Sequence, residues 1–111
     1  MKKEESKELS EGGASSFLEY NLPFKNISVG ISKVNGRYPE NGFDVDNEIE
    51  QVWYVKDGEG KVGISSEEFL ISKGDMVHIP KGEKYFIEGN NLQLVVSSTP
   101  PWTKNQHKNV E

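Results

Sequence analysis

Residues 50–60 read EQVWYVKDGEG. Aromatic and β-branched residues fill the first half of this stretch, which is the composition of a β-strand. The Asp-Gly and Glu-Gly steps that follow are typical of a tight turn, because glycine adopts positive φ angles without steric cost. With a period of two, Gln51, Trp53 and Val55 point to one face of the strand, and Val52 and Tyr54 point to the other. The stretch therefore predicts a strand that is apolar on both faces.

Seven further segments carry the same strand signal. They are SFLEYNLPF (16–24), NISVGISKV (26–34), KVGIS (61–65), EFLIS (68–72), MVHIP (76–80), YFIEG (85–89) and LQLVVSS (92–98). Glycine, asparagine or aspartate marks the turns expected between strands, at VNGR (34–37), KDGEGK (56–61), SKGD (72–75) and EGNN (88–91). The chain shows no helical periodicity of apolar residues. We therefore expect an all-β fold, a sandwich or closed barrel in which hairpins follow one another.

Composition limits the classes of protein that remain. The chain has 111 residues, 18 acidic against 13 basic side chains, a net charge of −5 and no cysteine. This length predicts one domain. Without a basic stripe we expect no nucleic-acid partner, and without cysteine no disulfide or thiolate chemistry is available. No apolar segment is long enough for a membrane helix or a signal peptide, so we expect a soluble, cytoplasmic protein with no membrane partner.

The first sixteen residues, MKKEESKELSEGGASS, are polar, charged or small. They offer little that a core would bury, so we expect a flexible tail over residues 1–16 and a single barrel domain over residues 17–111. A lid, or a strand exchanged between subunits, is the alternative interpretation of this tail.

Two blocks, GFDVDNEIEQVWYVKDGEG (42–60) and KGDMVHIPKGEKYFIEG (73–89), share the spacing of a known pair of motifs. Together they resemble the two signature motifs of the cupin superfamily, whose small double-stranded β-helix, or jelly-roll, barrels enclose an interior site. In the second block the matching residues are Gly74, Asp75, Pro80 and Gly82, and in the first block Gly58. The resemblance covers about 48 residues and implies a cupin-like jelly-roll barrel.

The resemblance also identifies the positions at which metal-binding cupins carry their ligands. Here those positions hold Gln51 and Tyr85, together with Asp44 and Asp46, or Val45 and Asn47 with the shorter family spacing. None of these is histidine, and the chain has only two histidines, at positions 78 and 107. Neutral amides and phenols are weak replacements for imidazole as ligands of iron, nickel or zinc. We therefore expect no metal site of the family type and no cofactor.

Four residues are candidates for binding a ligand in place of the metal. Gln51 either hydrogen-bonds a polar ligand or bonds Tyr85 across the former metal site and plugs it. Tyr85 is a candidate catalytic acid. Trp53 and Tyr38 offer flat faces on which a sugar or heterocycle could stack, although most aromatic residues in a small barrel belong to the core.

The acidic run FDVDNEIEQ (43–51) places Asp44, Asp46 and Glu48 at alternate positions. It lacks the central glycine of a calcium-binding loop, and alternation along a strand does not close a cage around an ion, so we expect a solvated strand edge. If Asp46 turns inward instead, it is the best available catalytic base or acceptor for a ligand hydroxyl. Further along, the Pro-Pro-Trp step stops strand pairing and is expected to lay Trp102 over one end of the barrel or on a neighbouring molecule.

These observations favour a binding module that holds a small polar or cyclic, sugar-like molecule among Gln51, Trp53, Tyr85, Asp46 and Tyr38. The alternatives are a metal-independent sugar isomerase or epimerase, and a structural dimeric barrel without a ligand. Because Val52 and Tyr54 would lie exposed on the outer face, we also expect a homodimer. In that dimer, SFLEYNLPF (16–24) could add to the edge of the partner's sheet.

Overall fold

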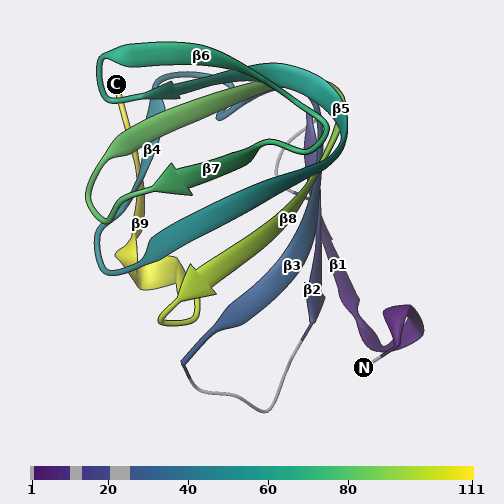
Figure 1. Ribbon diagram of the computed structural model, residues 1–111. Helices are drawn as coiled ribbons and strands as arrows, with labels where there is room; N and C mark the ends of the chain where they lie inside the picture. Colours follow the sequence, from purple (N-terminus) through teal and green to yellow (C-terminus); the bar gives the residue numbers. More distant parts are fainter. Residues whose placement is uncertain (1, 11–13, 21–25) are drawn as a thin grey trace.

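The computed structural model describes residues 2–10, 14–20 and 26–111. This part of the chain forms β-strands and two short 3-10 turns, and it contains no α-helix (Figure 1). The turns are η1 (Lys3–Glu5) and η2 (Lys104–Gln106), and the strands are β1 (Lys7–Ser10), β2 (Ser15–Tyr20), β3 (Ser28–Tyr38), β4 (Phe43–Asp46), β5 (Glu50–Ile64), β6 (Glu67–Ser72), β7 (Met76–Ile79), β8 (Lys84–Thr99) and β9 (His107–Val110). The all-β prediction is confirmed. Within these described ranges, no helical segment is long and apolar enough to cross a membrane.

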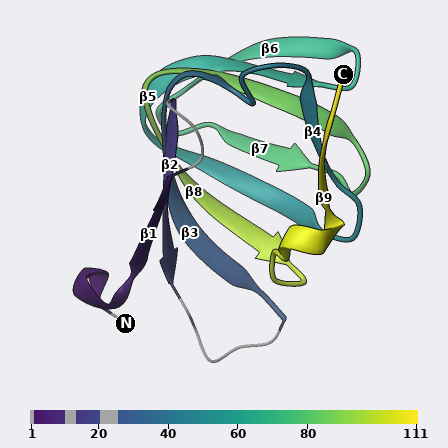
Figure 2. The same cartoon turned by 180° about the vertical axis from the view of Figure 1, so that it is seen from behind.

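The strands form a single curled sheet. Its order along one path is β1-β2-β3-β8-β4-β9, and β5 pairs with β6, β7 and β8. Figures 1 and 2 show β1, β2 and β3 at one side of the curl, and β4 beside β9 at the other. Each pair of neighbouring strands is antiparallel. However, β3 pairs with β8, which lies far from it in sequence, so the prediction that each strand forms a hairpin with the next is wrong.

Two long strands, β5 and β8, form the centre of the sheet. They pair from Glu50 with Thr99 to Ile64 with Tyr85, with register shifts near Asp57. The expected turns KDGEGK and EGNN are therefore bulges that bend continuous strands, since Gly58 has a φ of +79° and Asn91 a φ of 51°. The segment VNGR likewise contains a register shift inside β3, and SKGD alone of the four expected turns joins two strands, β6 and β7. Glycine and asparagine permit positive φ in a bulge as readily as in a turn, so the sequence signal is the same.

The interior of the curl holds the hydrophobic core. On β5 the side chains alternate as predicted: Trp53 and Val55 are 4% and 0% exposed, whereas Val52 and Tyr54 are 37% and 41% exposed. The other core residues come mainly from β7 and β8, and they include Val34, Val62, Ile71, Val77, Ile79, Tyr85, Ile87, Leu92 and Leu94. This alternation fixes which side chains of β5 face the interior site.

The segment expected to be a flexible tail contains strand structure. Within residues 1–16, β1 and the start of β2 form a hairpin in which Leu9 lies opposite Phe17, and β2 continues along β3. Leu9 is partly buried and Ser15 is buried, so the small apolar content of this stretch is used for packing. The separation into a tail and a barrel domain stays a prediction. The strand SFLEY pairs with β3 of its own chain, and residues 21–24 of the longer segment SFLEYNLPF extend into residues outside the described ranges.

Two glycines with positive φ should respond differently to alanine. A Cβ at Gly58 would lie 2.2 Å from the backbone oxygen of Asn91, whereas a Cβ at Gly74, with φ of +95°, meets nothing within 4 Å. Gly74→Ala should cost about 1 kcal/mol for the left-handed backbone alone. Gly58→Ala should cost about 3 kcal/mol, since the bulge must also shift. Urea unfolding measures both, and equal losses would contradict a bulge that is closed against β8.

Candidate functional site

The site is built around Asp46, at the end of β4. This strand pairs on one side with β8, where Asp44 lies opposite Tyr85, and on the other side with β9, where Asp46 lies opposite His107. Both aspartates are 2% exposed. The expectation of a solvated strand edge is therefore wrong for Asp44 and Asp46, because β9 covers the side of β4 that would otherwise face water. Glu48, which follows the strand, is exposed as expected.

Five side chains donate hydrogen bonds to the Asp46 carboxylate. Oδ2 accepts from Gln51 Nε2 and from Tyr85 Oη, the latter at 2.8 Å. Oδ1 accepts from three residues of the C-terminal segment: His107 Nδ1 at 2.7 Å, Gln106 Nε2 at 2.8 Å and Trp102 Nε1 at 3.2 Å. A buried carboxylate needs partners for its oxygen lone pairs, and these five donors supply them.

The hydrogen bonds also set the charge of Asp46. Burial alone would raise its pKa, but the hydrogen bonds from His107, Gln106 and Tyr85 outweigh burial and lower the pKa below the usual 3.8. Asp46 is therefore an anion at neutral pH. A carboxylate with a lowered pKa and both oxygens occupied is a poor proton acceptor, which disfavours Asp46 as a general base.

His107 lies between the two buried aspartates. Its Nδ1 lies 2.7 Å from Asp46 Oδ1, and its Nε2 lies 3.1 Å from Asp44 Oδ2. Burial alone would lower the pKa of His107, but the hydrogen bonds and charges of Asp44 and Asp46 outweigh it and raise the pKa from 6.5 to about 10. His107 is thus an imidazolium that neutralises one of two buried negative charges. Asn109 Nδ2 donates to Asp44 Oδ1 at 3.2 Å.

On the barrel side of Asp46, the hydrogen bonds fix the orientation of three further side chains. Gln51 donates to Asp46 and accepts from Trp53 Nε1 at 2.8 Å. The Trp53 ring meets the Tyr85 ring edge to face, with the centroids 5.3 Å apart. Burial and the neighbouring charge of Asp46 hold the pKa of Tyr85 well above 10. The Tyr85 proton therefore stays on the phenol and is donated to Asp46, which disfavours Tyr85 as a catalytic acid.

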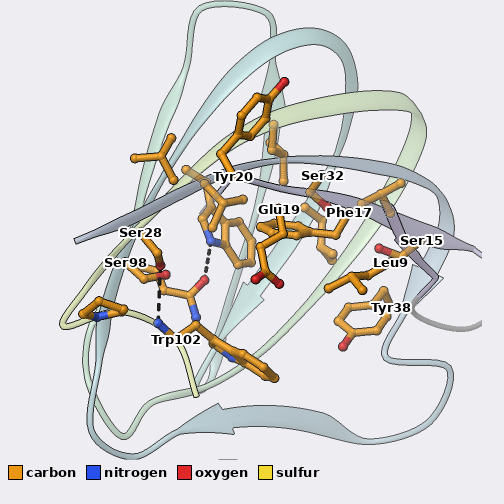
Figure 3. A pocket seen from close by; sticks show the side chains of 18 of the residues that line it. Leu9, Ser15, Phe17, Glu19, Tyr20, Ser28, Ser32, Tyr38, Ser98 and Trp102 are labelled. Atoms are coloured by element: carbon orange, nitrogen blue, oxygen red, sulfur yellow. Dashed lines mark hydrogen bonds between the residues drawn. The ribbon is translucent and has the colours of Figure 1, made fainter. Parts of the chain in front are cut away.

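A cavity of about 590 Å³ opens next to this cluster. Figure 3 shows side chains from several strands, and Trp102 from the C-terminal segment, gathered around it. Its lining combines aromatic, aliphatic and polar groups: Leu9, Phe17, Glu19, Tyr20, Tyr38, Gln51, Trp53, Tyr85, Ile87, Leu94, Val96, Trp102 and Lys104, with Ser15, Ser28, Ser32 and Ser98 among the others. A volume of this size is within the range of small-molecule sites, roughly 300–1,000 Å³.

Four of the five predicted ligand-binding residues share this cavity. Gln51, Trp53, Tyr85 and Tyr38 line it, whereas Asp46 lies behind Gln51 and Tyr85 and does not line it. The interpretation that Gln51 bonds Tyr85 and plugs the former metal site is wrong, since Gln51 and Tyr85 each bond Asp46 and the space beside them is open. Their role in ligand binding stays a prediction.

Sequence reasoning missed two groups of residues. The first is Phe17 and Glu19 on β2, which line the cavity from a strand flanking the expected tail. Alternation along SFLEY could have placed these two on one face. The second is Gln106 and His107, which approach Asp46 from sixty residues away, and no local pattern in the sequence signals that contact. Trp102, expected over one end of the barrel or on a neighbouring molecule, lines the cavity and is 43% exposed.

The side chains at the family's metal positions do not fit a transition metal. Gln51 and Tyr85 are neutral, and the oxygens of Asp46 are already occupied by five donors. Both ring nitrogens of His107 are directed at carboxylate oxygens, Nδ1 at Asp46 and Nε2 at Asp44, so both already have partners within the protein. In the ranges that the structure describes, no group of three histidine, cysteine, aspartate or glutamate side chains is arranged to hold a metal ion.

The His107 cluster predicts a pH dependence of stability. Because its folded pKa is about 10 against 6.5 unfolded, the contribution of His107 is full below pH 6.5 and is lost as pH rises towards 10. The contribution of Asp46, whose pKa is lowered, is present above about pH 4 and is lost on acidification. His107→Gln should lower the free energy of unfolding by about 2 kcal/mol at pH 6, and the deficit should shrink by pH 10.

Urea midpoints of both proteins between pH 4 and 10 measure this deficit. His78→Gln is the matched control, because His78 is exposed and its Nε2 pairs with the carboxylate of Glu50, another exposed side chain, at 2.8 Å. It should change stability little at any pH. A deficit for His107→Gln that stays constant, or widens as pH rises, would contradict the imidazolium between two carboxylates.

Comparison with known proteins gives a weak sequence relationship. No protein-family model matches the chain. An uncharacterized protein of Methanocaldococcus jannaschii, MJ1618, is 33% identical over 57 residues, which is 49% of this chain and 46% of the relative. The match thus spans less than half the length of that relative.

Solved structures give a much stronger match in fold. Pac13, a nucleoside dehydratase, superimposes over 99% of this chain and 88% of its own, with a TM-score of 0.89 at 16% identity, and variants of the Streptomyces protein are solved with uridine. KdgF from Halomonas sp. matches 87% of this chain and 88% of its own (TM-score 0.73, 14% identity). The cupin domain of Schizosaccharomyces pombe Cnp3 matches 78% of this chain and 64% of its own (TM-score 0.69, 13% identity). The chain therefore has the barrel fold of the cupin superfamily.

Proposed function

We propose that this barrel binds a small polar ring compound, such as a sugar or a nucleoside, in its interior cavity without the help of a metal ion. One observation carries the proposal: Gln51 and Tyr85 are held in fixed orientations by Asp46 at the wall of an open cavity of about 590 Å³. A preorganised polar pair beside aromatic walls is the usual composition of a small-molecule site.

The remaining hydrogen-bonding capacity of these two residues indicates what a ligand must offer. Gln51 uses one amide proton for Asp46 and one lone pair for Trp53, which leaves one donor and one acceptor. Tyr85 donates its proton to Asp46, so its oxygen can only accept from a ligand. Hydroxyl groups of a sugar, which donate and accept, match this pair. The rings of Trp53 and Tyr38 provide surfaces for stacking.

The similarity in fold to Pac13 supports a ligand of about the size of a nucleoside. Pac13, which covers nearly the whole of this chain, is solved with uridine. A nucleoside is a sugar joined to a flat heterocycle, and such a molecule suits a cavity with hydroxyl-binding groups and aromatic walls. At 16% identity the likeness carries no residue roles, so the proposal depends on the geometry of this chain.

The alternative functions have less support. A sugar isomerase or epimerase that uses Asp46 as base and Tyr85 as acid would need two groups that are free to exchange protons, and here each is committed to the other. A purely structural barrel would have a filled interior, which the cavity disfavours. The cytoplasmic location and the lack of a nucleic-acid partner stay predictions from composition.

Uridine binding, measured by calorimetry or by tryptophan fluorescence, tests the proposal. Gln51→Ala removes the amide that faces the cavity, and it should weaken binding by about 10-fold, the value of one hydrogen bond. Gln93→Ala is the control, because Gln93 lies on the neighbouring strand β8 and does not line the cavity. Dialysis against EDTA should leave the affinity unchanged. Loss of binding after EDTA, or full affinity in Gln51→Ala, would contradict the proposal.

We also propose that the chain forms a homodimer through the outer face of the sheet. The register aligns one apolar row across five strands: Leu18, Ile31, Val95, Tyr54 and Met76. Tyr54 and Met76 are 41% and 68% exposed. An apolar row of this length on the outside of a small barrel is typical of a surface that a second subunit covers.

Light scattering coupled to gel filtration tests the dimer. The wild type should have twice the chain mass of 12.5 kDa, and Tyr54→Arg should shift it to one chain, because a charge in the middle of the row would be buried unpaired. Leu70→Arg is the control, since Leu70 is 82% exposed but lies on β6, outside the row. A monomeric wild type would rule out this interface.

A further inference from the structure

Glu19 is a carboxylate that the cavity contains and that the proposed function does not use. It lies on β2, between Lys7 of β1 and Gly30 of β3 in the register of the sheet. With Phe17 and Ser15, it lines the cavity, whereas Leu18 between them does not. Figure 3 shows its side chain directed into the group of lining residues that includes Tyr38 and Trp102. Glu19 is partly buried.

The surroundings of Glu19 keep its carboxylate available. Gly30 has no side chain, and the Phe17 ring occupies the space there, since a Cβ on Gly30 would lie 2.2 Å from Phe17 Cζ. Phe17 is thereby held against the backbone of β3 beside Glu19. Among the described residues, no hydrogen bond or ion pair reaches the Glu19 carboxylate: Lys7, opposite it on β1, is exposed and forms no ion pair, and the ion pairs of these residues involve Lys61, His78 and His107. Each of the other carboxylates that reach the interior, Asp44 and Asp46, has protein partners.

A carboxylate in such a position needs a partner from elsewhere. It shares the cavity lining with aromatic and aliphatic groups such as Trp53, Ile87 and Val96, which offer a carboxylate no hydrogen bonds or few. Donor groups of a bound molecule would provide the missing hydrogen bonds. Hydrogen bonds to a charged acceptor are stronger than those between neutral groups, so this contact would dominate the choice of ligand.

The charges around the cavity also disfavour an anionic ligand. Asp44, Asp46 and His107 together leave one negative charge in the cluster behind Gln51 and Tyr85, and Glu19 adds a second. The cation in the lining, Lys104, is exposed, so its charge is screened by water. An anionic group inside the cavity would face two negative charges without a buried cation to offset them.

We propose that Glu19 selects the ligand: it accepts hydrogen bonds from hydroxyl or amino groups of a neutral or cationic ring compound, and it excludes anionic ones such as sugar acids and nucleotides. This inference rests on the proposed function, because it assigns the ligand class of the same cavity. Glu19 is thereby assigned as a specificity residue of this cavity, and sugar-derived acids are excluded from its ligands.

Matched probes that differ in charge test the inference. The pairs are uridine with uridine 5′-monophosphate, and glucosamine with glucuronic acid, titrated by calorimetry at pH 7. The wild type should prefer the neutral or cationic member of each pair. Glu19→Gln should bind that member about 10- to 100-fold more weakly, the loss of one charge-assisted hydrogen bond. The same variant should bind the anionic member about 3-fold or more tightly than the wild type, because a repulsive charge is gone.

Glu8→Gln is the matched control, since it removes the same charge from the neighbouring strand β1, where Glu8 is exposed and does not line the cavity. It should leave the affinities for all four probes unchanged. Urea midpoints check that each variant is folded.

The outcomes separate the two proposals. Opposite shifts for the two members of a pair support the selection by Glu19, and a merely unfolded variant cannot produce them. Unchanged affinities, or equal losses for both members, would overturn the role of Glu19 and leave the proposed function standing. If neither member of either pair binds to the wild type, both proposals fall.

Discussion

The Asp46 carboxylate holds the interior of this barrel together. Its two oxygens join side chains from β5, β8 and the segment that runs through η2 into β9, so strands distant in sequence meet at one anion. Buried ion pairs contribute little net stability when their desolvation is counted, but removal of one partner is costly because the other charge is left unpaired. The cluster thus fixes the arrangement of the cavity wall more than it stabilises the fold.

This arrangement reverses the electrostatics expected of the family. In a metal-binding cupin a central cation draws electron-pair donors inward, whereas here a central anion draws proton donors inward: two amides, a phenol, an indole and an imidazolium. The sequence-based hypothesis that uncharged groups replace the metal centre is therefore only half correct. Gln51 and Tyr85 are neutral, but the group that positions them is charged, and so is its partner His107.

The fold was predictable because its signals are local. Alternation along residues 51–55 identified the inner and outer faces of β5, and the motif residues Gly58, Gly74 and Pro80 indicated the jelly-roll barrel. The bulges were misread as turns, since glycine at positive φ serves both. Of the site, Gln51, Trp53 and Tyr85 could be placed from strand period and motif spacing, whereas Tyr38 was named for its aromatic ring alone. The burial of Asp44 and Asp46 could not, because it depends on β9 pairing with β4 across sixty residues.

The cavity has two kinds of wall, and they differ in how freely they can change. Gln51, Trp53 and Tyr85 belong to β5 and β8, whose mutual pairing forms the centre of the barrel. Phe17, Glu19 and Trp102 come from β2 and from the segment after β8, which lie at the margins of the sheet. Phe17 and Glu19 take no part in the hydrogen bonds to Asp46, so substitutions at these two positions should change the lining while β5 and β8 keep their pairing. Trp102 donates to Asp46, so the same freedom does not extend to the segment after β8. A new ligand is therefore reached at least risk to folding through changes on β2.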